Sequence, residues 1–436
     1  MKLNTKRTLW AGLAFMSICA FWQVYDSIVP LILKNTFDLN DSISGIIMAA
    51  DNVLALFLLP LFGTLSDRTN TKIGKRMPFI LAGTLAACIF AFIIPVAAER
   101  RNLALMITAL GGALLSMAVY RSPAVALMPD ITPKPLRSKA NAIINLTGTV
   151  GGILMLAAIA ILVPDGDNPS YFPLYIFMIV FMVLCIAGLF WKIKERDLAQ
   201  IAREEEADFE KAAEVEPENT GKMDKAARRS FMFMLASIFF WFMGYNAITT
   251  SFSKYGNVYW GLEGGDFAKA LMIAQAAAIA AYIPVGAAAT KFGRKKTILA
   301  GVAMLAVAFG SCAFYNTFSG MIYVFFILAG FGWASINVNS FPMIVEMCSG
   351  ADVGKYTGYY YTASQAAQII TPILSGFVLE YGYLLIDRAN PDAGYVFLFP
   401  YGAIFVVASF ITMLFVKKGD SFAPTKKGLE SFDVGD

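Results

Sequence analysis

The first apolar run of the chain contains Phe21-Trp22-Gln23-Val24-Tyr25-Asp26-Ser27-Ile28, and 220 residues later the sequence reads Trp241-Phe242-Met243-Gly244-Tyr245-Asn246-Ala247-Ile248. A second pair repeats at nearly the same distance, because Asp51 precedes Pro60 by nine residues and Gln275 precedes Pro284 by nine. Polar residues at matching depths of repeated apolar segments predict a transporter with two pseudo-symmetric halves and a binding site where the halves meet.

The composition is typical of a membrane protein. Of the 436 residues, 58% are hydrophobic and 15% are charged, whereas a soluble protein carries about a quarter of its residues as charges. The apolar residues come in runs of about 20, the length that a helix needs to cross the bilayer core. We therefore predict an all-α membrane protein with twelve transmembrane helices, at residues 9–33, 43–65, 78–98, 103–128, 140–163, 172–191, 230–252, 267–289, 297–315, 320–347, 356–379 and 395–416.

Polar segments divide these runs into two groups of six. We predict an N-terminal six-helix bundle over 1–192, a cytoplasmic linker over 193–229, a C-terminal six-helix bundle over 230–416 and a cytoplasmic tail over 417–436. Sparse apolar positions in the charged linker predict a surface helix followed by a flexible tether. Lys and Arg gather on the side of both termini, which predicts cytoplasmic termini in a multi-pass protein of the plasma (inner) membrane. The formal net charge of +4 then reflects contact with anionic lipid, not nucleic-acid binding.

Other functional classes lack their sequence signals. The chain has no histidine, so proton coupling would have to use carboxylates. It has no Walker loop, no His-Glu metal motif and no nucleophile elbow, and we expect neither an enzyme nor a bound cofactor or metal. The five cysteines lie in apolar runs, which predicts small packing residues and no disulfides.

A loop motif lies between the second and third runs, where the sequence reads Gly63-Thr64-Leu65-Ser66-Asp67-Arg68 and then Gly74-Lys75-Arg76-Met77-Pro78-Phe79. Asp67 can accept hydrogen bonds from a helix N-terminus, and we expect the basic residues to lie on anionic headgroups. The motif resembles the cytoplasmic loop signature of the major facilitator superfamily. That resemblance implies a conformational latch containing Asp67 and Arg68, whereas a simple membrane anchor is the structural alternative.

A longer set of motifs narrows the resemblance. Tyr120-Arg121-Ser122-Pro123-Ala124-Val125-Ala126-Leu127-Met128-Pro129-Asp130-Ile131-Thr132-Pro133 is followed by Arg137-Ser138-Lys139-Ala140-Asn141. With Trp22, Tyr25 and Pro30 in the first run and Asp51-Asn52 in the second, the chain resembles the glycoside–pentoside–hexuronide:cation symporters, in the branch similar to sucrose and maltose proton symporters. The resemblance covers all twelve runs, is clearest in the first half, and implies transport of a sugar or glycoside coupled to a cation.

One position departs from that family. Its melibiose-type members carry Asp-x-x-x-Asp-Pro in the second run for sodium or lithium, whereas Ala55 and Leu59 stand ahead of Pro60 here. The departure favours a proton over sodium as the coupling ion.

Two acids inside the apolar runs, Asp26 and Asp51, are the candidates for proton coupling. At about 1.5 Å of rise per residue, they fall at nearly the same depth of their helices. An acid near the bilayer centre costs about 2.5–3.5 kcal/mol, so it needs a partner, water or a function. Burial and a neighbouring carboxylate both favour the neutral form, so either acid could bind a proton near neutral pH. A structural hydrogen bond between helices is the alternative.

Aromatic and amide residues at comparable depths are the candidates for substrate binding. An aromatic ring can pack on the C–H face of a sugar while polar groups hold its hydroxyls. For each amide, a hydrogen bond between helices is the alternative. The predicted substrate-binding residues are Trp22, Gln23, Tyr25, Asp26, Asp51, Asn52, Tyr245, Asn246, Trp333, Asn337, Gln365 and Gln368.

Arg121 is the only basic residue clearly inside a predicted span. It needs a counter-charge, and Asp67, Asp130 and Glu346 are the candidates for an inner gate ion pair that breaks as the halves move. A static structural pair is the alternative.

Together these inferences predict a monomeric secondary transporter that imports a neutral sugar or glycoside, of di- or oligosaccharide size, in symport with a proton. Proton-coupled efflux of drugs or metabolites is an alternative, because paired acids also suit cationic drugs. Sodium-coupled sugar symport and a sugar sensor without net transport are further alternatives.

Overall fold

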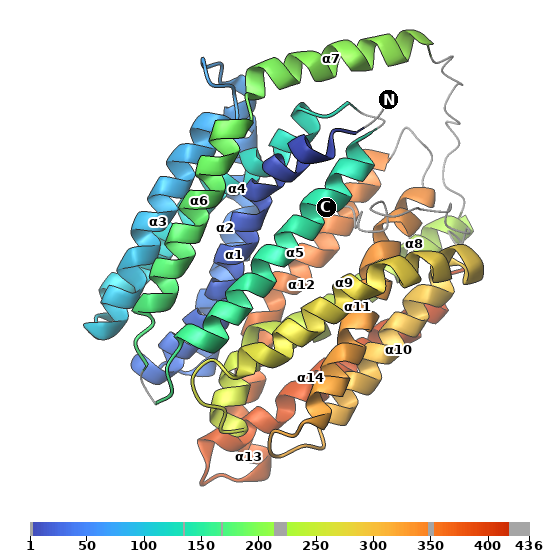
Figure 1. Cartoon of the computed structure of the whole chain (residues 1–436). Coiled ribbons are helices and arrows are strands. Elements are labelled where there is room, and N and C mark those ends of the chain that lie inside the picture. Colours follow the sequence, from blue (N-terminus) through green and yellow to red (C-terminus); the bar gives the residue numbers. More distant parts are fainter. Residues whose placement is uncertain (1–2, 134–135, 167–168, 213–224, 348–352, 418–436) are drawn as a thin grey trace. The chain divides into compact units, whose positions relative to one another are not determined.

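A computed structural model describes residues 3–133, 136–166, 169–212, 225–347 and 353–417. Within these ranges the chain is helical (Figure 1) and has twelve helices long and apolar enough to cross a membrane. The prediction of twelve spans is therefore confirmed. The elements are α1 (Thr5–Leu31), η1 (Ile32–Thr36), α2 (Asp41–Arg68), α3 (Met77–Glu99), α4 (Leu103–Asp130), α5 (Arg137–Leu162), α6 (Phe172–Lys192), α7 (Glu195–Ala212), α8 (Lys225–Lys254), η3 (Tyr255–Tyr259), α9 (Phe267–Phe292), α10 (Arg294–Cys312), α11 (Met321–Glu346), α12 (Val353–Tyr381), α13 (Tyr383–Ile386), η5 (Pro391–Phe397) and α14 (Leu398–Leu414).

Contacts between helices divide the chain into two compact units. The first contains Met1–Tyr25 and Val53–Glu216, and the second contains Asp26–Asn52 and Pro217–Asp436. Two of the boundaries lie inside α1 and α2, so the end of α1, the α1–α2 turn and the start of α2 belong to the second unit. The two bundles expected from the sequence, 1–192 and 230–416, stay a prediction.

In the first unit, α3 packs against α4 and α6, and α5 packs against α6. Helices α1 and α5 approach closely at Gly151, where a Cβ atom would lie 2.4 Å from the carbonyl oxygen of Met16. The surface helix expected in the linker is present as α7, which crosses the end of this unit at which α6 ends (Figure 1). The expected tether and tail fall largely on 213–224 and 418–436, outside the described residues.

In the second unit, α8 packs against α12 and α14, while α11 packs against α9 and α10. The sequence repeat has a structural counterpart here, because α1 continues into the π-helical turn η1 and α8 continues into the π-helical turn η3. Equivalent positions of the two turns meet: Asn35 Nδ2 donates to Asn257 Oδ1 at 3.0 Å. Residues 225–229, expected in the linker, form the beginning of α8.

The cysteines pack within helices. Cys88, Cys185 and Cys312 are buried, Cys19 is half-buried, and none of these four forms a disulfide. Cys348 lies outside the described residues.

Candidate functional site

The aromatic residues of the α1 repeat segment form one cluster. The rings of Trp22 and Tyr25 meet edge to face with centroids 5.4 Å apart, and Phe21 stacks on Tyr25 at 6.1 Å. Trp22 Nε1 is buried without a hydrogen-bond partner among the described residues. Because a buried donor left unsatisfied costs about 1–3 kcal/mol, this N–H suits a ligand or an ordered water. Gln23, also expected in the site, is half-buried.

The two candidate proton carriers are both half-buried, Asp26 in α1 and Asp51 in α2. Asp51 Oδ1 accepts hydrogen bonds from the backbone N–H of Asn52 at 2.6 Å and from its side-chain Nδ2 at 2.7 Å. Asn52 therefore helps to orient the carboxylate of Asp51. That Asp26 and Asp51 act together in proton coupling stays a prediction.

In the second unit, two predicted substrate-binding residues lie in direct contact. Tyr245 of α8 and Trp333 of α11 stack face to face, with ring centroids 3.8 Å apart and planes 9° apart. Phe242 meets the Trp333 ring edge to face at 5.7 Å, which holds the indole in place. Both stacked residues are half-buried.

The candidate amides differ in how they are satisfied. Asn246 Nδ2 and Gln365 Oε1 are buried and have no hydrogen-bond partner among the described residues, so neither atom makes an interhelical hydrogen bond within that part of the chain. Asn337 of α11 and Gln368 of α12 are half-buried. Buried polar atoms normally find partners, and a polar ligand or water would supply them here.

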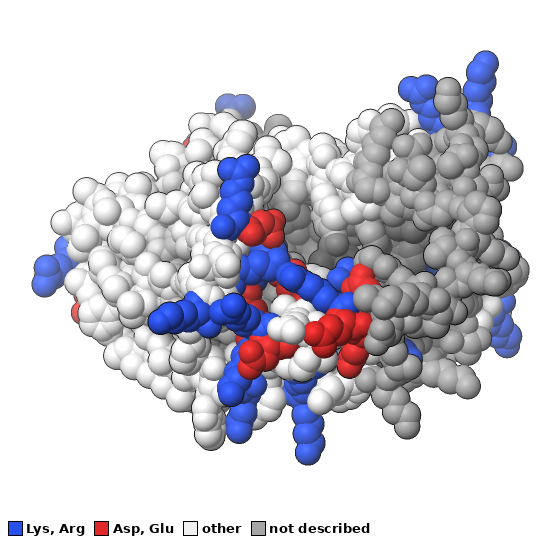
Figure 2. Space-filling model, turned by 90° about the horizontal axis from the view of Figure 1, so that it is seen from above, with Lys and Arg blue, Asp and Glu red and all other residues white. Residues whose placement is uncertain are grey.

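Arg76 is the centre of a charge network in the first unit. Its Nη2 contacts Asp67, and its Nε donates to Asp130 Oδ2 at 2.8 Å, an oxygen that also lies 3.2 Å from Lys75 Nζ. The Arg76 side chain is 6% exposed, so the expectation that the basic residues of this loop lie on lipid headgroups is wrong for Arg76. Basic and acidic side chains gather closely on the face seen from above (Figure 2).

Glu195, the first residue of α7, places its carboxylate at the N-terminus of α3. Its carboxylate accepts from the backbone N–H groups of Lys75, Arg76 and Met77 at 2.8–2.9 Å, where the helix dipole favours a negative charge. Gly74 has φ 119°, and a Cβ atom there would lie 2.2 Å from Glu195 Oε2. Asp67, expected at a helix N-terminus, contacts Arg76 instead. Nothing in the local sequence signals Glu195, because the partners are about 120 residues apart.

Arg121 of α4 faces an aromatic ring. Its guanidinium carbon lies 6.0 Å from the centre of the Trp22 ring, within the range of a cation–π interaction. Two of its candidate counter-charges, Asp67 and Asp130, are bonded to Arg76, and the side chain of Glu346 lies outside the described part. Its ion pair in an inner gate stays a prediction. Arg68, the other candidate gating residue, is exposed at the end of α2.

One buried ion pair was not foreseen from the sequence. Lys254 Nζ contacts Asp41 Oδ1, and both side chains are 5% exposed. The expected spans 230–252 and 267–289 left Lys254 in a loop, but α8 extends to Lys254 and buries its side chain. A hydropathy pattern cannot reveal a partner 213 residues away.

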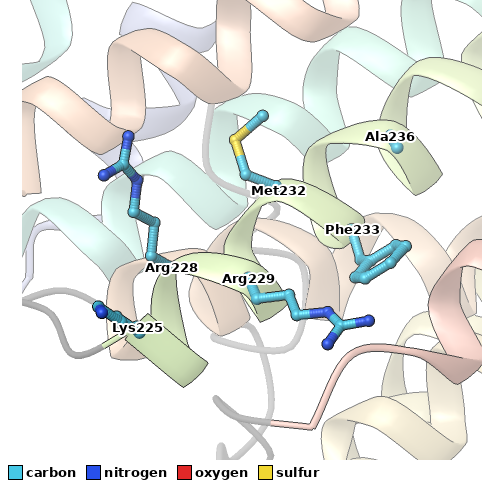
Figure 3. A pocket seen from close by; sticks show the side chains of 6 residues that line it. All are labelled: Lys225, Arg228, Arg229, Met232, Phe233 and Ala236. Carbon is cyan, nitrogen blue, oxygen red and sulfur yellow. The ribbon is translucent and has the colours of Figure 1, made fainter.

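A cavity of about 510 Å³ lies at the start of α8, lined by Lys225, Arg228, Arg229, Met232, Phe233 and Ala236. The cations point in different directions from the helix, and Arg229 lies toward Phe233 (Figure 3) with its guanidinium 5.7 Å from the ring centre. Diverging cations do not converge on one anion, so we assign no ligand to this cavity.

The chain is similar to plant sucrose transport proteins over part of its length. It is 28% identical over 157 residues to sucrose transport protein SUC3 of Arabidopsis thaliana. This matched segment covers 32% of this chain and 26% of that protein. It is 24% identical over 189 residues to sucrose transport protein SUT4 of Oryza sativa subsp. indica, covering 39% and 31%. The matched segments thus span about a quarter to a third of these relatives.

Solved structures share the fold over almost the whole chain. A crystal structure of the nucleoside transporter NupG is 15% identical with a TM-score of 0.70, covering 95% of this chain and 100% of that one. A bacterial homologue of the iron transporter ferroportin is 11% identical with a TM-score of 0.67, covering 95% and 99%. All of these proteins are named as transporters, in agreement with the prediction of a transporter rather than an enzyme. The model of the Major Facilitator Superfamily matches residues 11–282 and 260–432, and the chain therefore belongs to this superfamily.

Proposed function

We propose that the protein is a secondary transporter that carries a neutral sugar or glycoside, of di- or oligosaccharide size, into the cell together with a proton. The observation that carries the proposal is the stacked pair Tyr245–Trp333. The protein also buries Trp22 Nε1, Asn246 Nδ2 and Gln365 Oε1, which have no hydrogen-bond partner within the described ranges. A sugar has an apolar C–H face and a rim of hydroxyls, so its site needs both features. The names of the sucrose transport proteins above support this substrate class.

In this proposal Asp51 and Asp26 carry the proton. Protonation removes negative charge from the occupied site, which lowers the cost of passing through a closed, dry state. The half-buried positions of both acids support the assignment, because a coupling group must exchange protons with water and also sense its neighbours. Ala55 and Leu59, where sodium-coupled relatives of this type would have acids, favour the proton over sodium.

The proposed topology places both termini in the cytoplasm and the protein, as a monomer, in the plasma membrane. The Arg76 network and α7 then face the cytoplasm, and the α1–α2 turn faces the outside. The distribution of Lys and Arg along the sequence supports this orientation.

Uptake into proteoliposomes tests the function directly. The purified protein is reconstituted, and uptake of radiolabelled sucrose and maltose is measured with the interior alkaline, with no gradient, and with a protonophore, each with and without sodium. We expect accumulation that requires the pH gradient and does not require sodium. Accumulation that requires sodium would indicate sodium symport. Accumulation under the opposite gradient, with the interior acidic, would indicate exchange of substrate for protons and would favour efflux. Specific binding without uptake would favour a sensor. Protein-free vesicles give the background.

A further inference from the structure

Asp41, Lys254 and Tyr395 join three segments that are far apart in the sequence. Asp41 is the first residue of α2, Lys254 the last residue of α8, and Tyr395 lies in η5. Lys254 Nζ contacts Asp41 Oδ1, and the Tyr395 hydroxyl lies 2.9 Å from both carboxylate oxygens of Asp41. All three belong to the second unit, and each is almost fully buried.

Further hydrogen bonds hold the same ends together. The backbone N–H of Ser42 donates to Glu380 Oε2 of α12 at 2.9 Å, so two carboxylates, Asp41 and Glu380, lie at the N-terminus of α2. Asn35 of η1 is bonded to Asn257 of η3. The α1–α2 turn is therefore tied to η3, and the start of α2 to α8, α12 and η5, by polar side chains rather than by apolar packing alone.

Two glycines bring the backbones of α2 and α12 into contact at this place. A Cβ atom on Gly45 would lie 2.1 Å from the carbonyl oxygen of Pro372, and one on Gly376 would lie 2.5 Å from the carbonyl oxygen of Asp41. Small residues permit such close helix approach in membranes. Because the fit is tight at both points, the two helices either pack in this arrangement or separate, and small intermediate shifts are disfavoured.

The energetics of a buried ion pair favour the same two-state behaviour. A buried pair contributes little net stability, because desolvation offsets much of the attraction. Removing one partner is strongly unfavourable, since the other charge remains buried and unpaired. Separation of the start of α2 from the end of α8 in water hydrates both ions at once and avoids that cost. The ion pair therefore has two favoured states: both ions paired and buried, or both ions separated and hydrated.

We propose that Asp41, Lys254 and Tyr395 form the outer lock of the transport cycle. While bonded they hold the α1–α2 turn against α8, α12 and η5 and keep the outer side closed, and they separate when the protein opens outward. The proposal rests on the function and topology proposed above and assigns to these three residues a role in the transport reaction itself.

Accessibility of a thiol beside the lock tests the proposal without any sugar. Ser44 is buried at 1% exposure and lies on the same face of α2 as Asp41. A Ser44→Cys chain in vesicles is treated from the outside with a membrane-impermeant maleimide, and the chain without this change gives the background of the native cysteines. We expect Lys254→Met or Asp41→Asn to raise the labelling rate at least about tenfold. Tyr395→Phe, which keeps the ring, should raise it about threefold.

Matched variants separate the lock from general effects. Lys269→Met removes an exposed cation bonded to Asp266 and should leave labelling unchanged. Gly45→Ala should raise labelling without changing any charge, whereas Gly358→Ala on α12, with nothing within 4 Å of its Cβ, should not.

Unchanged labelling, within twofold, in Lys254→Met and Tyr395→Phe chains that remain monodisperse would overturn the lock. Tyr395→Phe keeps the test decisive if loss of a charge prevents folding. Failure of the unmodified chain to carry sugar, together with a labelling increase in the variants, would contradict the proposed substrate and leave the lock standing.

Discussion

The rings of Tyr245 and Trp333 lie parallel with centroids 3.8 Å apart, although the residues belong to different helices of the second unit, α8 and α11. Phe242 also contacts the indole, with the two ring planes nearly perpendicular. Aromatic residues fixed in this way form a rigid apolar plate, which costs little entropy when it receives the C–H face of a sugar.

Replacement of Trp333 by Ala should raise the KM for disaccharide uptake at least about tenfold, because the plate is lost along with its contact area. Trp333→Phe should have a smaller effect, since it keeps a ring. The KM is measured by initial rates in proteoliposomes. Trp191→Ala is the control, because that side chain is 76% exposed at the end of α6. A KM for Trp333→Ala equal to that of the control would remove the stack from the site.

Replacement of Asp51 by Asn should abolish sugar accumulation driven by a pH gradient while sparing exchange of labelled for unlabelled sugar. The amide resembles a permanently neutral acid, so the site can still move when occupied but no longer carries a proton. Uptake and exchange are compared in the same vesicles. Asp387→Asn, at an exposed position after α13, should leave both unchanged. Full accumulation by the Asp51→Asn chain would contradict the coupling role.

The same change at Asp26 distinguishes one coupling acid from two. If Asp26 shares the proton, Asp26→Asn should also abolish accumulation driven by a pH gradient. In the double variant, Asp26→Asn with Asp51→Asn, the pH dependence of exchange should then change by less than the sum of the changes in the two single variants. The assay is exchange measured from pH 5 to pH 9. Normal accumulation in Asp26→Asn would leave Asp51 as the single coupling acid.

The helices were predictable because a bilayer allows few solutions. Backbone groups in hydrocarbon must be bonded within the segment, so each long apolar run became a helix, and the repeat in the sequence reappears in the paired turns η1 and η3. The ends of the helices were less predictable. In the sequence, Lys254 indicates that an apolar run has ended, but α8 extends to Lys254 and its side chain is buried because the carboxylate of Asp41 pairs with it.

The charged residues of the α2–α3 loop also have partners that could not be predicted from the sequence. The resemblance implied a latch containing Asp67 and Arg68, but the sequence could not show that Arg76 is buried between Asp67 and Asp130. Nor could it reveal Glu195, which lies at the start of the linker and reaches the N-terminus of α3. Partners of buried charges are set by tertiary packing, whereas hydropathy and charge counts describe each segment separately.

Replacement of Gly151 by Ala should destabilise the first unit. The new Cβ would meet the carbonyl oxygen of Met16 at 2.4 Å, so α1 and α5 would have to move apart, and overpacking of this kind costs about 1–3 kcal/mol. The thermal unfolding midpoint in detergent should fall by several degrees. Gly111→Ala in α4, with nothing within 4 Å of its Cβ, should leave the midpoint unchanged. Equal midpoints would show that the helices adjust without cost.

Replacement of Glu195 by Ala should loosen the start of α3. The change leaves the N–H groups of Lys75, Arg76 and Met77 without the carboxylate that now accepts from them, at a cost of about 2–3 kcal/mol. Amide hydrogen exchange of the segment 75–80 should therefore accelerate, while exchange in α8 stays unchanged. Glu195→Gln keeps an acceptor oxygen but loses the charge. Exchange of segment 75–80 in this variant should therefore be faster than in the unmodified chain and slower than in Glu195→Ala. Glu204→Ala on the same helix removes an exposed carboxylate bonded to Gln200 and should have no effect on segment 75–80. If Glu195→Ala matches Glu204→Ala, the attachment of α7 to α3 does not depend on this carboxylate.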